Sequence, residues 1–194
     1  MVAYIIAKEI LEIKETDILK TLGSYTGAWR RMEFKGNFSV SQFSIPVYDD
    51  YAHHPTEIKA SLLAFREKYS KNKIICVYQP HQALRLKNLF SEFVDAFKNC
   101  DILILIPVYE VAGRDRINRE YTSEKLVSAI FKKYPKKRIQ FLADPKKIKR
   151  FLTGTLDSAN YLSGIASAKV ETLSPIIVMM GAGTISEYTK LLIK

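Results

Sequence analysis

The chain has 194 residues, 47% of them apolar and 26% charged, with a formal net charge of +10. This composition is ordinary for a globular protein and predicts one domain with a short appendage. No apolar run reaches the roughly 18 residues of a membrane span. The opening segment is apolar but contains Lys8 and Glu9 and has no small-residue cleavage site, which argues against a secretory signal.

The two cysteines, Cys76 and Cys100, lie inside or beside apolar segments and have no partner at metal-ligand spacing. Buried, reduced thiols are therefore favoured over a disulfide or a zinc site. Together with the missing secretory signal, this pattern predicts a cytoplasmic protein.

The excess of basic residues calls for an anionic partner, which could be nucleic acid, a membrane or a phosphorylated small molecule. Each basic cluster falls at a predicted helix end or loop, where solvated charge is usual. None is interleaved with aromatic residues as a platform for stacked bases would be, so nucleic-acid binding is disfavoured, and no membrane partner is expected. The clusters are Lys132–Lys133, Lys136–Arg138 and Lys146–Arg150.

The N-terminal segment is expected to form two short helices and a connector. Apolar residues recur there at helical spacing, and the second helix is predicted to have Thr16 as its N-cap and Gly23 at its end. The turn-rich stretch Tyr25–Glu33 then leads into a strand-like segment. Helices this short cannot bury their apolar faces alone, so residues 1–33 are interpreted as the end of a larger central domain and 34–194 as a domain of its own.

From there, apolar strand candidates alternate with amphipathic helical segments. This alternation is typical of a sheet covered on both faces, and it predicts a Rossmann-like α/β fold with a mostly parallel sheet. The strand candidates are Phe43–Val47, Ile74–Tyr78, Ile102–Val108, Ile139–Leu142 and Ile176–Met180. The helical candidates are Thr56–Tyr69, Leu84–Lys98, Ser123–Tyr134 and Lys146–Ser163.

Polar residues gather directly after the predicted strands, where open parallel sheets bind their ligands. All three histidines of the chain, His53, His54 and His81, follow the first two strand candidates. Such a coincidence would be unusual for scattered structural histidines. The turns after the third and last candidates are Tyr109–Asp115 and Gly181–Thr184.

The stretch Asp49–Glu57 is the most informative one. Pro55 restricts His54 to an extended backbone, and Thr56 can cap the helix that follows. Two carboxylates followed by two imidazoles are harder to explain as scaffolding, because polar groups concentrated at a strand end pack poorly. Asp50 is suited to accept both hydroxyls of a ribose. A metal site and a purely structural cap are the alternatives; the metal ligands would be Asp49, His53, His54 and His81.

Three side chains after the first two strands could share one cleft. His53 could donate to a carboxylate or phosphate and change its charge near neutral pH. His81 lies at a strand end and Arg85 about one turn into the next helix. Arginine suits a bidentate grip on a carboxylate, although a solvent-exposed Arg85 is at least as well supported.

Two further segments are ambiguous. Arg30–Glu33 is interpreted as a hinge with surface charges. The alternative is that a guanidinium of this segment reaches a nucleotide bound between two domains. Gly181–Thr184 resembles a phosphate-cradling turn but is too short for the dinucleotide pattern, so a tight strand-to-helix turn is favoured. No G-x-x-x-x-G-K-[ST] loop occurs, and no G-x-S-x-G nucleophile turn. The chain therefore has polar residues for one side of a binding site, whereas a phosphate-binding loop for the other side does not occur in it.

Taken together, these motifs resemble the Mur ligase family, the ATP-dependent amide ligases of peptidoglycan synthesis. Arg30–Glu33 and the helices before it resemble the end of the central ATPase domain and its hinge, and the later motifs resemble the C-terminal domain. Within the family, D-D-Y-[GA]-H-H-P-T-E with Q-P-H-x3-R matches here without a gap and is specific to the members that add L-alanine to UDP-N-acetylmuramate. Members that recycle murein tripeptide share the A-H-H-P core and are the second choice.

The resemblance implies a three-domain enzyme in which ATP and Mg²⁺ generate an acyl phosphate that the amine of the amino acid attacks. It implies nucleotide contacts for Arg31 and Asp50, with Asp50 on the ribose. The implied ligands are UDP-N-acetylmuramate, L-alanine and ATP, and the implied partners are the N-terminal and central domains. His53 and Arg85 are the implied catalytic residues. The implied substrate contacts are Tyr51, His53, His54, His81 and Arg85.

Two substitutions depart from the family pattern: Arg114 stands where a glutamate is frequent, and Gln82 replaces a more usual Arg or Thr. The phosphate loop and the UDP-sugar domain have no counterpart in the chain, so the chain alone is expected to be inactive. A non-catalytic module that binds nucleotide or nucleic acid is the alternative from a different functional class.

Overall fold

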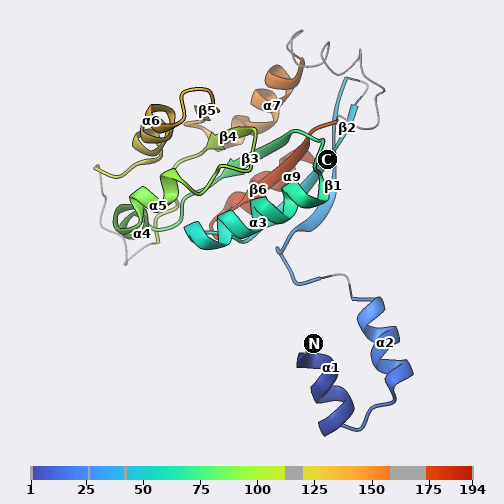
Figure 1. Cartoon of the computed structure of the whole chain (residues 1–194). Coiled ribbons are helices and arrows are strands. Elements are labelled where there is room, and N and C mark those ends of the chain that lie inside the picture. Colours follow the sequence, from blue (N-terminus) through green and yellow to red (C-terminus); the bar gives the residue numbers. More distant parts are fainter. Residues whose placement is uncertain (1, 26, 42, 112–119, 158–173, 194) are drawn as a thin grey trace.

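The computed structural model describes residues 2–25, 27–41, 43–111, 120–157 and 174–193. Their centre is a six-stranded sheet in the order β1-β2-β6-β3-β4-β5 (Figure 1). β1 runs antiparallel to β2, and the other neighbours are parallel, which confirms the predicted mostly parallel sheet. The strands are β1 (Glu33–Val40), β2 (Phe43–Asp50), β3 (Ile74–Tyr78), β4 (Ile102–Leu105), β5 (Arg138–Phe141) and β6 (Ile176–Met180).

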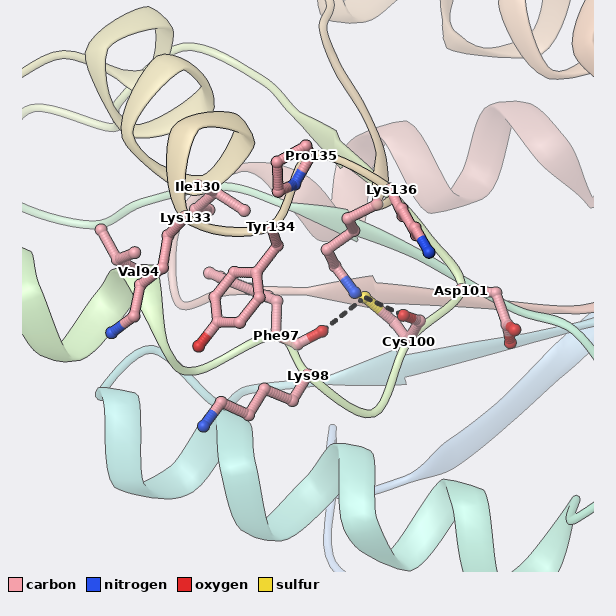
Figure 2. A pocket seen from close by; sticks show the side chains of 11 residues that line it. Val94, Phe97, Lys98, Cys100, Asp101, Ile130, Lys133, Tyr134, Pro135 and Lys136 are labelled. Atoms are coloured by element: carbon pink, nitrogen blue, oxygen red, sulfur yellow. Dashed lines mark hydrogen bonds between the residues drawn. The ribbon is translucent and has the colours of Figure 1, made fainter.

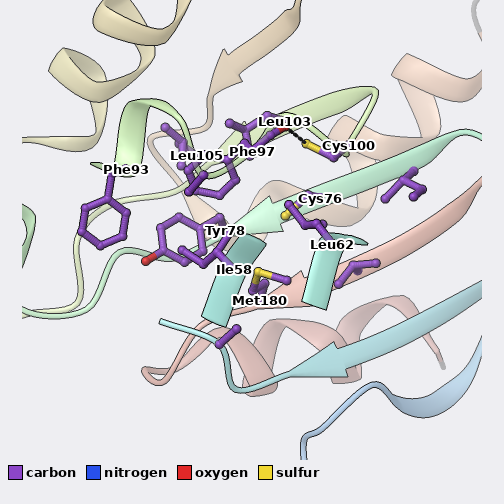
Figure 3. Packing of buried hydrophobic residues seen from close by; sticks show 14 of the residues in the cluster. Ile58, Leu62, Cys76, Tyr78, Phe93, Phe97, Cys100, Leu103, Leu105 and Met180 are labelled. Atoms are coloured by element: carbon purple, nitrogen blue, oxygen red, sulfur yellow. Dashed lines mark hydrogen bonds between the residues drawn. The ribbon is translucent and has the colours of Figure 1, made fainter. Parts of the chain in front are cut away.

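Helices cover both faces of the sheet, as predicted. β3 and β6 are buried at every position, which explains why they are apolar throughout rather than alternating. On one face, Tyr78 packs against Phe93 and Phe97 in the larger core cluster (Figure 3). That face is covered by α3 (Pro55–Lys68), α4 (Ala83–Asn88), α5 (Phe90–Val94) and α6 (Ser123–Lys133). The other carries η2 (Pro145–Lys147), α7 (Ile148–Asp157) and α9 (Ile185–Leu192).

The N-terminal helices lie apart from the sheet (Figure 1). They are α1 (Val2–Ile5), the π-helical turn η1 (Ile6–Ile10) and α2 (Glu15–Gly23). Their apolar side chains, among them Val2 and Ile10, are largely exposed. The predicted N-cap is wrong, because α2 begins one residue before Thr16 and Lys14 takes the cap position without a side-chain hydrogen bond. No helix among the described residues is long and apolar enough to cross a membrane.

Two predicted segments need correction, and a third lies partly outside the described residues. The candidate strand Ile102–Val108 ends at Leu105, since Pro107 has no amide hydrogen for the ladder. The candidate helix Leu84–Lys98 is wrong as one helix: the backbone leaves helical geometry at Leu89 (φ −114°, ψ 22°), directly after Asn88, a weak helix former. α7 ends at Asp157 within the described residues, and the rest of the candidate Lys146–Ser163 lies outside them, as does Arg114.

Candidate functional site

Four rings form a continuous row beyond the carboxyl ends of β2, β3 and β4. The ring centroids of Tyr51 and His53 are 5.4 Å apart, those of His53 and His81 are 5.8 Å apart, and those of His81 and Tyr109 are 5.4 Å apart. The chain passes from β2 to β3 across β6, which lies between them, so the row stands where strand order and chain order differ. Open α/β sheets bind ligands at such positions.

The start of α3 fixes the loop that carries His53. His54 is the N-cap: its backbone is extended (φ −104°, ψ 145°), as Pro55 predicts, and its Nδ1 accepts a hydrogen bond from the amide of Thr56 (3.3 Å). The predicted capping by Thr56 is wrong, because the helix starts at Pro55 and so moves the cap position to His54. One ring nitrogen of His54 is therefore committed to the helix rather than to a ligand.

Glu57 holds His53 in place. Its Oε2 accepts the backbone amides of His53 (3.0 Å) and His54 (3.2 Å) and lies 3.2 Å from His53 Nδ1, which is also 3.1 Å from the carbonyl of Tyr51. Two acceptors around Nδ1 favour a proton on that nitrogen and leave Nε2 as the acceptor of the imidazole. Burial raises the pKa of the Glu57 carboxyl, but the amides of His53 and His54 outweigh this and hold the pKa below its usual range.

Glu57→Gln is expected to lower the free energy of unfolding at pH 7 by about 0.5 to 1 kcal/mol, because it removes the negative charge at the helix N-terminus. The folded pKa of Glu57 is lowered, so this contribution is full above the ordinary value of 4.5 and disappears as the pH falls through the folded value. Urea unfolding at a series of pH values from 7 down to 2 measures it. Glu67→Gln, at the exposed far end of α3, is the control; a difference between Glu57→Gln and the unmodified chain that does not shrink as the pH falls would contradict this explanation.

His81 connects the row to Arg85. The guanidinium Nη1 lies 3.3 Å from His81 Nδ1 and donates to the carbonyl of His81 (3.3 Å). Tyr109 supports His81 from the next strand: the two rings are stacked at 19°, and Tyr109 donates its amide to the carbonyl of Pro80 (2.7 Å). Tyr109 was not among the site residues predicted from the sequence, although its place directly after the candidate strand Ile102–Val108 was the available signal.

The turn after β6 must be built from glycine. Gly181 has φ +142°, and a Cβ there would lie 2.7 Å from the carbonyl oxygen of Gln79. A Cβ on Gly183 would lie 2.6 Å from Tyr109 Cγ. Gln79 itself is buried and donates to the hydroxyl of Thr184 (3.2 Å). The turn therefore packs closely against residues that follow β3 and β4, which agrees with the favoured interpretation as a tight turn.

A buried ion pair lies behind the row. The guanidinium of Arg30, only 3% exposed, donates through Nε and Nη2 to the two oxygens of Asp49 (3.1 and 3.2 Å) and through Nη2 to the carbonyl of Gly181 (2.6 Å). Burial raises the pKa of the Asp49 carboxyl, and the guanidinium opposes this shift. Arg30 therefore joins β2 to β6 and is not a surface charge of a hinge.

Asp50 and Arg31, the implied nucleotide contacts, differ in accessibility. Asp50 is 1% exposed; its carboxylate accepts the amides of Met32 (2.9 Å) and Ala52 (2.8 Å) and the hydroxyl of Ser61 (3.2 Å). This carboxylate fastens the connector to the strand end, and no ribose could reach it in this conformation. The guanidinium of Arg31 is half-exposed and lies 5.8 Å from the ring centroid of Tyr51, beside the row.

The alternative metal site is not assembled. Asp49 is held by Arg30, and His54 caps α3. Among the residues that the structure describes, no three His, Cys, Asp or Glu side chains are placed to hold a metal ion.

Comparison with known proteins decides the family. Residues 30–161 match the family model described as Mur ligase, glutamate ligase domain. The chain belongs to the Mur ligase family. Two curated relatives in this family are both named UDP-N-acetylmuramate–L-alanine ligase. The one from Agrobacterium fabrum is 39% identical over 178 residues, which cover 92% of this chain and 33% of the relative. The one from Clostridium perfringens is 43% identical over 122 residues, which cover 63% of this chain and 25% of the relative.

The chain thus spans about a third or less of the length of these Mur ligase relatives. Solved structures show the same fold. A UDP-N-acetylmuramate-alanine ligase from Thermotoga maritima superimposes with a TM-score of 0.65 at 21% identity, over 97% of this chain and 34% of that one. A murein peptide ligase from Psychrobacter arcticus gives 0.59 at 19% identity, over 89% and 31%.

Two cavities lie away from the row of four rings. One, of about 560 Å³, is lined by α5, α6 and the loops that follow them, including Phe97 and Tyr134 (Figure 2). Lys137 also lines this cavity, and its ammonium donates to the carbonyl of Cys100 (2.5 Å). The other, of about 810 Å³, runs along β5. Cys76 and Cys100 are both buried and free, as predicted.

Proposed function

We propose that this chain is the C-terminal domain of an ATP-dependent ligase that adds L-alanine to UDP-N-acetylmuramate. The observation that carries the proposal is the row of rings at the strand ends of a Mur ligase domain, with Arg85 beside it; the row consists of Tyr51, His53, His81 and Tyr109. The names of the two curated relatives support the choice of substrate. In this proposal residues 1–33 are the end of the central domain and its hinge, and 34–194 are the C-terminal domain.

The proposed chemistry is acyl transfer. The amine of L-alanine attacks the acyl-phosphate carbon of the activated muramoyl group, a C–N bond forms, and inorganic phosphate leaves with the electrons of the C–O bond. The amine must lose a proton in this step. His53 Nε2 is the acceptor proposed for that proton, and Glu57 is the group that orients the ring. Arg85 is proposed to hold the carboxylate of the incoming amino acid.

The phosphates of ATP and Mg²⁺ are proposed to bind to the preceding domain. The described residues offer no cluster of acidic ligands that fits Mg²⁺, and the sequence has no phosphate loop. The contribution proposed for this chain is the half-exposed guanidinium of Arg31 beside Tyr51, whereas the buried Asp50 is proposed to reach a ribose only after domain closure releases it. The chain alone is therefore expected to lack activity.

His53→Ala is expected to lower kcat about 100-fold in a ligase that contains this chain and its preceding domains, because it removes the proton acceptor. Steady-state phosphate release at saturating L-alanine measures it. The matched control is Lys59→Ala, which changes an exposed residue of α3, and it should retain full turnover. A His53→Ala enzyme that turns over at a near-normal rate would remove the residue from the mechanism.

A further inference from the structure

The sheet has an open edge at β5. Within the described residues β5 pairs with β4 alone and is the last strand of the sheet. The amide of Leu142 donates to the carbonyl of Leu105 in β4 (2.8 Å). Because successive backbone groups of a strand alternate in direction, the amides and carbonyls of Ile139 and Phe141 face the open side. Unpaired strand groups of this kind are a template for a further strand.

The cavity of about 810 Å³ runs along this edge. Its basic lining residues are Lys137, Arg138, Lys147 and Arg150, and no acidic side chain lines it. Within the part of the chain that the structure describes, Lys147 lies 3.6 Å from Asp144, whereas neither Arg138 nor Arg150 has an ion-pair partner. Two of the three basic clusters of the sequence, Lys136–Arg138 and Lys146–Arg150, therefore meet at the open edge of the sheet.

The two sides of the edge differ in chemistry. Ile139 and Phe141 pack towards the core on the α6 face, where Phe131 of α6 is 54% exposed and lines the cavity. Since side chains alternate along a strand, Arg138 points to the opposite face, the face of α7 that carries Arg150. A strand added here would find cations on one face and an apolar ring on the other.

We propose that β5 binds an extended acidic segment of a partner protein as an additional strand. Backbone hydrogen bonds to Ile139 and Phe141 would supply affinity, and alternate side chains would supply specificity. The segment would carry acidic residues towards Arg138 and Arg150 and apolar residues towards Phe131. A single-stranded nucleic acid would use the cations but would leave both the strand backbone and the apolar face without a role. Charged edge residues that only prevent aggregation are the simpler explanation, and they predict no complex.

The test uses the whole chain and a fluorescein-labelled nonapeptide of alternating Glu and Val. Anisotropy should report binding, and amide exchange at Ile139 and Phe141 should slow when the peptide is added. The double variant Arg138→Glu with Arg150→Glu should weaken binding about 30-fold, since each new glutamate would repel a glutamate of the peptide. The matched double reversal Lys59→Glu with Lys190→Glu makes the same change in net charge at exposed positions of α3 and α9, and should change binding by about threefold or less.

Three outcomes would overturn the proposal. One is the absence of binding by the unmodified peptide. Another is unchanged affinity for a peptide that is N-methylated at every residue, which has no amide hydrogen to donate to β5 from either edge; this arm needs no variant of the chain. The third is tighter, Arg138-dependent binding of a thymidine oligonucleotide, which would indicate a nucleic-acid surface in place of a peptide groove.

Discussion

Arg30→Ala should lower the free energy of unfolding by about 3 to 5 kcal/mol, because it leaves a buried carboxylate without its partner. Asp49 is 2% exposed and loses both hydrogen bonds from the guanidinium, and the carbonyl of Gly181 loses a third. The loss should be larger at neutral pH than in acid, since protonation of the Asp49 carboxyl relieves the buried charge. Urea unfolding monitored by circular dichroism measures the effect.

The neighbouring residue is the control for this experiment. Arg31 has the same side chain, but it is half-exposed and lies 3.9 Å from Glu57. Arg31→Ala should therefore cost about 0 to 1 kcal/mol. Equal losses in the two variants would mean that the buried pair does not join β2 to β6 as described.

Gly181→Ala should destabilise the fold by about 4 kcal/mol, the sum of a strained backbone and an overpacked contact. The φ of +142° is unfavourable for any residue with a Cβ, and the added atom would meet the backbone oxygen of Gln79 at 2.7 Å. A backbone atom cannot move aside as a flexible side chain can. The expected result is a large fall in the urea midpoint, or a chain that does not fold.

Gly154→Ala is the matched control and should raise the free energy of unfolding, whereas Gly181→Ala lowers it. Gly154 lies in α7, and a Cβ there would meet nothing within 4 Å. Alanine in such a helix position is expected to stabilise by about 0.5 to 1 kcal/mol. A Gly181→Ala chain as stable as the Gly154→Ala chain would contradict the close approach of β3 and β6 at this turn.

The sheet was predictable where burial on both faces makes a strand apolar throughout. β3 and β6 have the predicted boundaries for this reason. β2 extends past the predicted Val47 to Asp50, because polar residues at its end are buried through hydrogen bonds that a hydropathy pattern does not contain. β1 was only a strand-like segment in the sequence, since its edge position leaves polar residues among its apolar ones.

The sequence predicted which turns meet at the site. It predicted less well which contacts each side chain makes there. Because the carboxyl ends of parallel strands meet at one edge of a sheet, the sequence predicted that His53 and His81 could share one cleft, and their ring centroids lie 5.8 Å apart although β6 separates their strands. The sequence could not separate Arg30 from Arg31, because only the fold determines which of two adjacent guanidinium groups is buried. His54 likewise has a capping contact that depends on the exact start of α3. The implied ligand-binding and catalytic roles of all candidate residues stay predictions; these residues are Arg31, Asp50, Tyr51, His53, His54, His81 and Arg85.

The most direct test of the proposed ligase is phosphate release by this chain joined at the predicted hinge to the preceding domains of the Agrobacterium fabrum relative. With ATP, Mg²⁺ and UDP-N-acetylmuramate present, release should depend on added L-alanine, and the chain alone should release none. Release that responds to a murein tripeptide and not to L-alanine would contradict the substrate and favour the recycling ligase. No release, while the unaltered relative is active, would contradict the catalytic role of this domain.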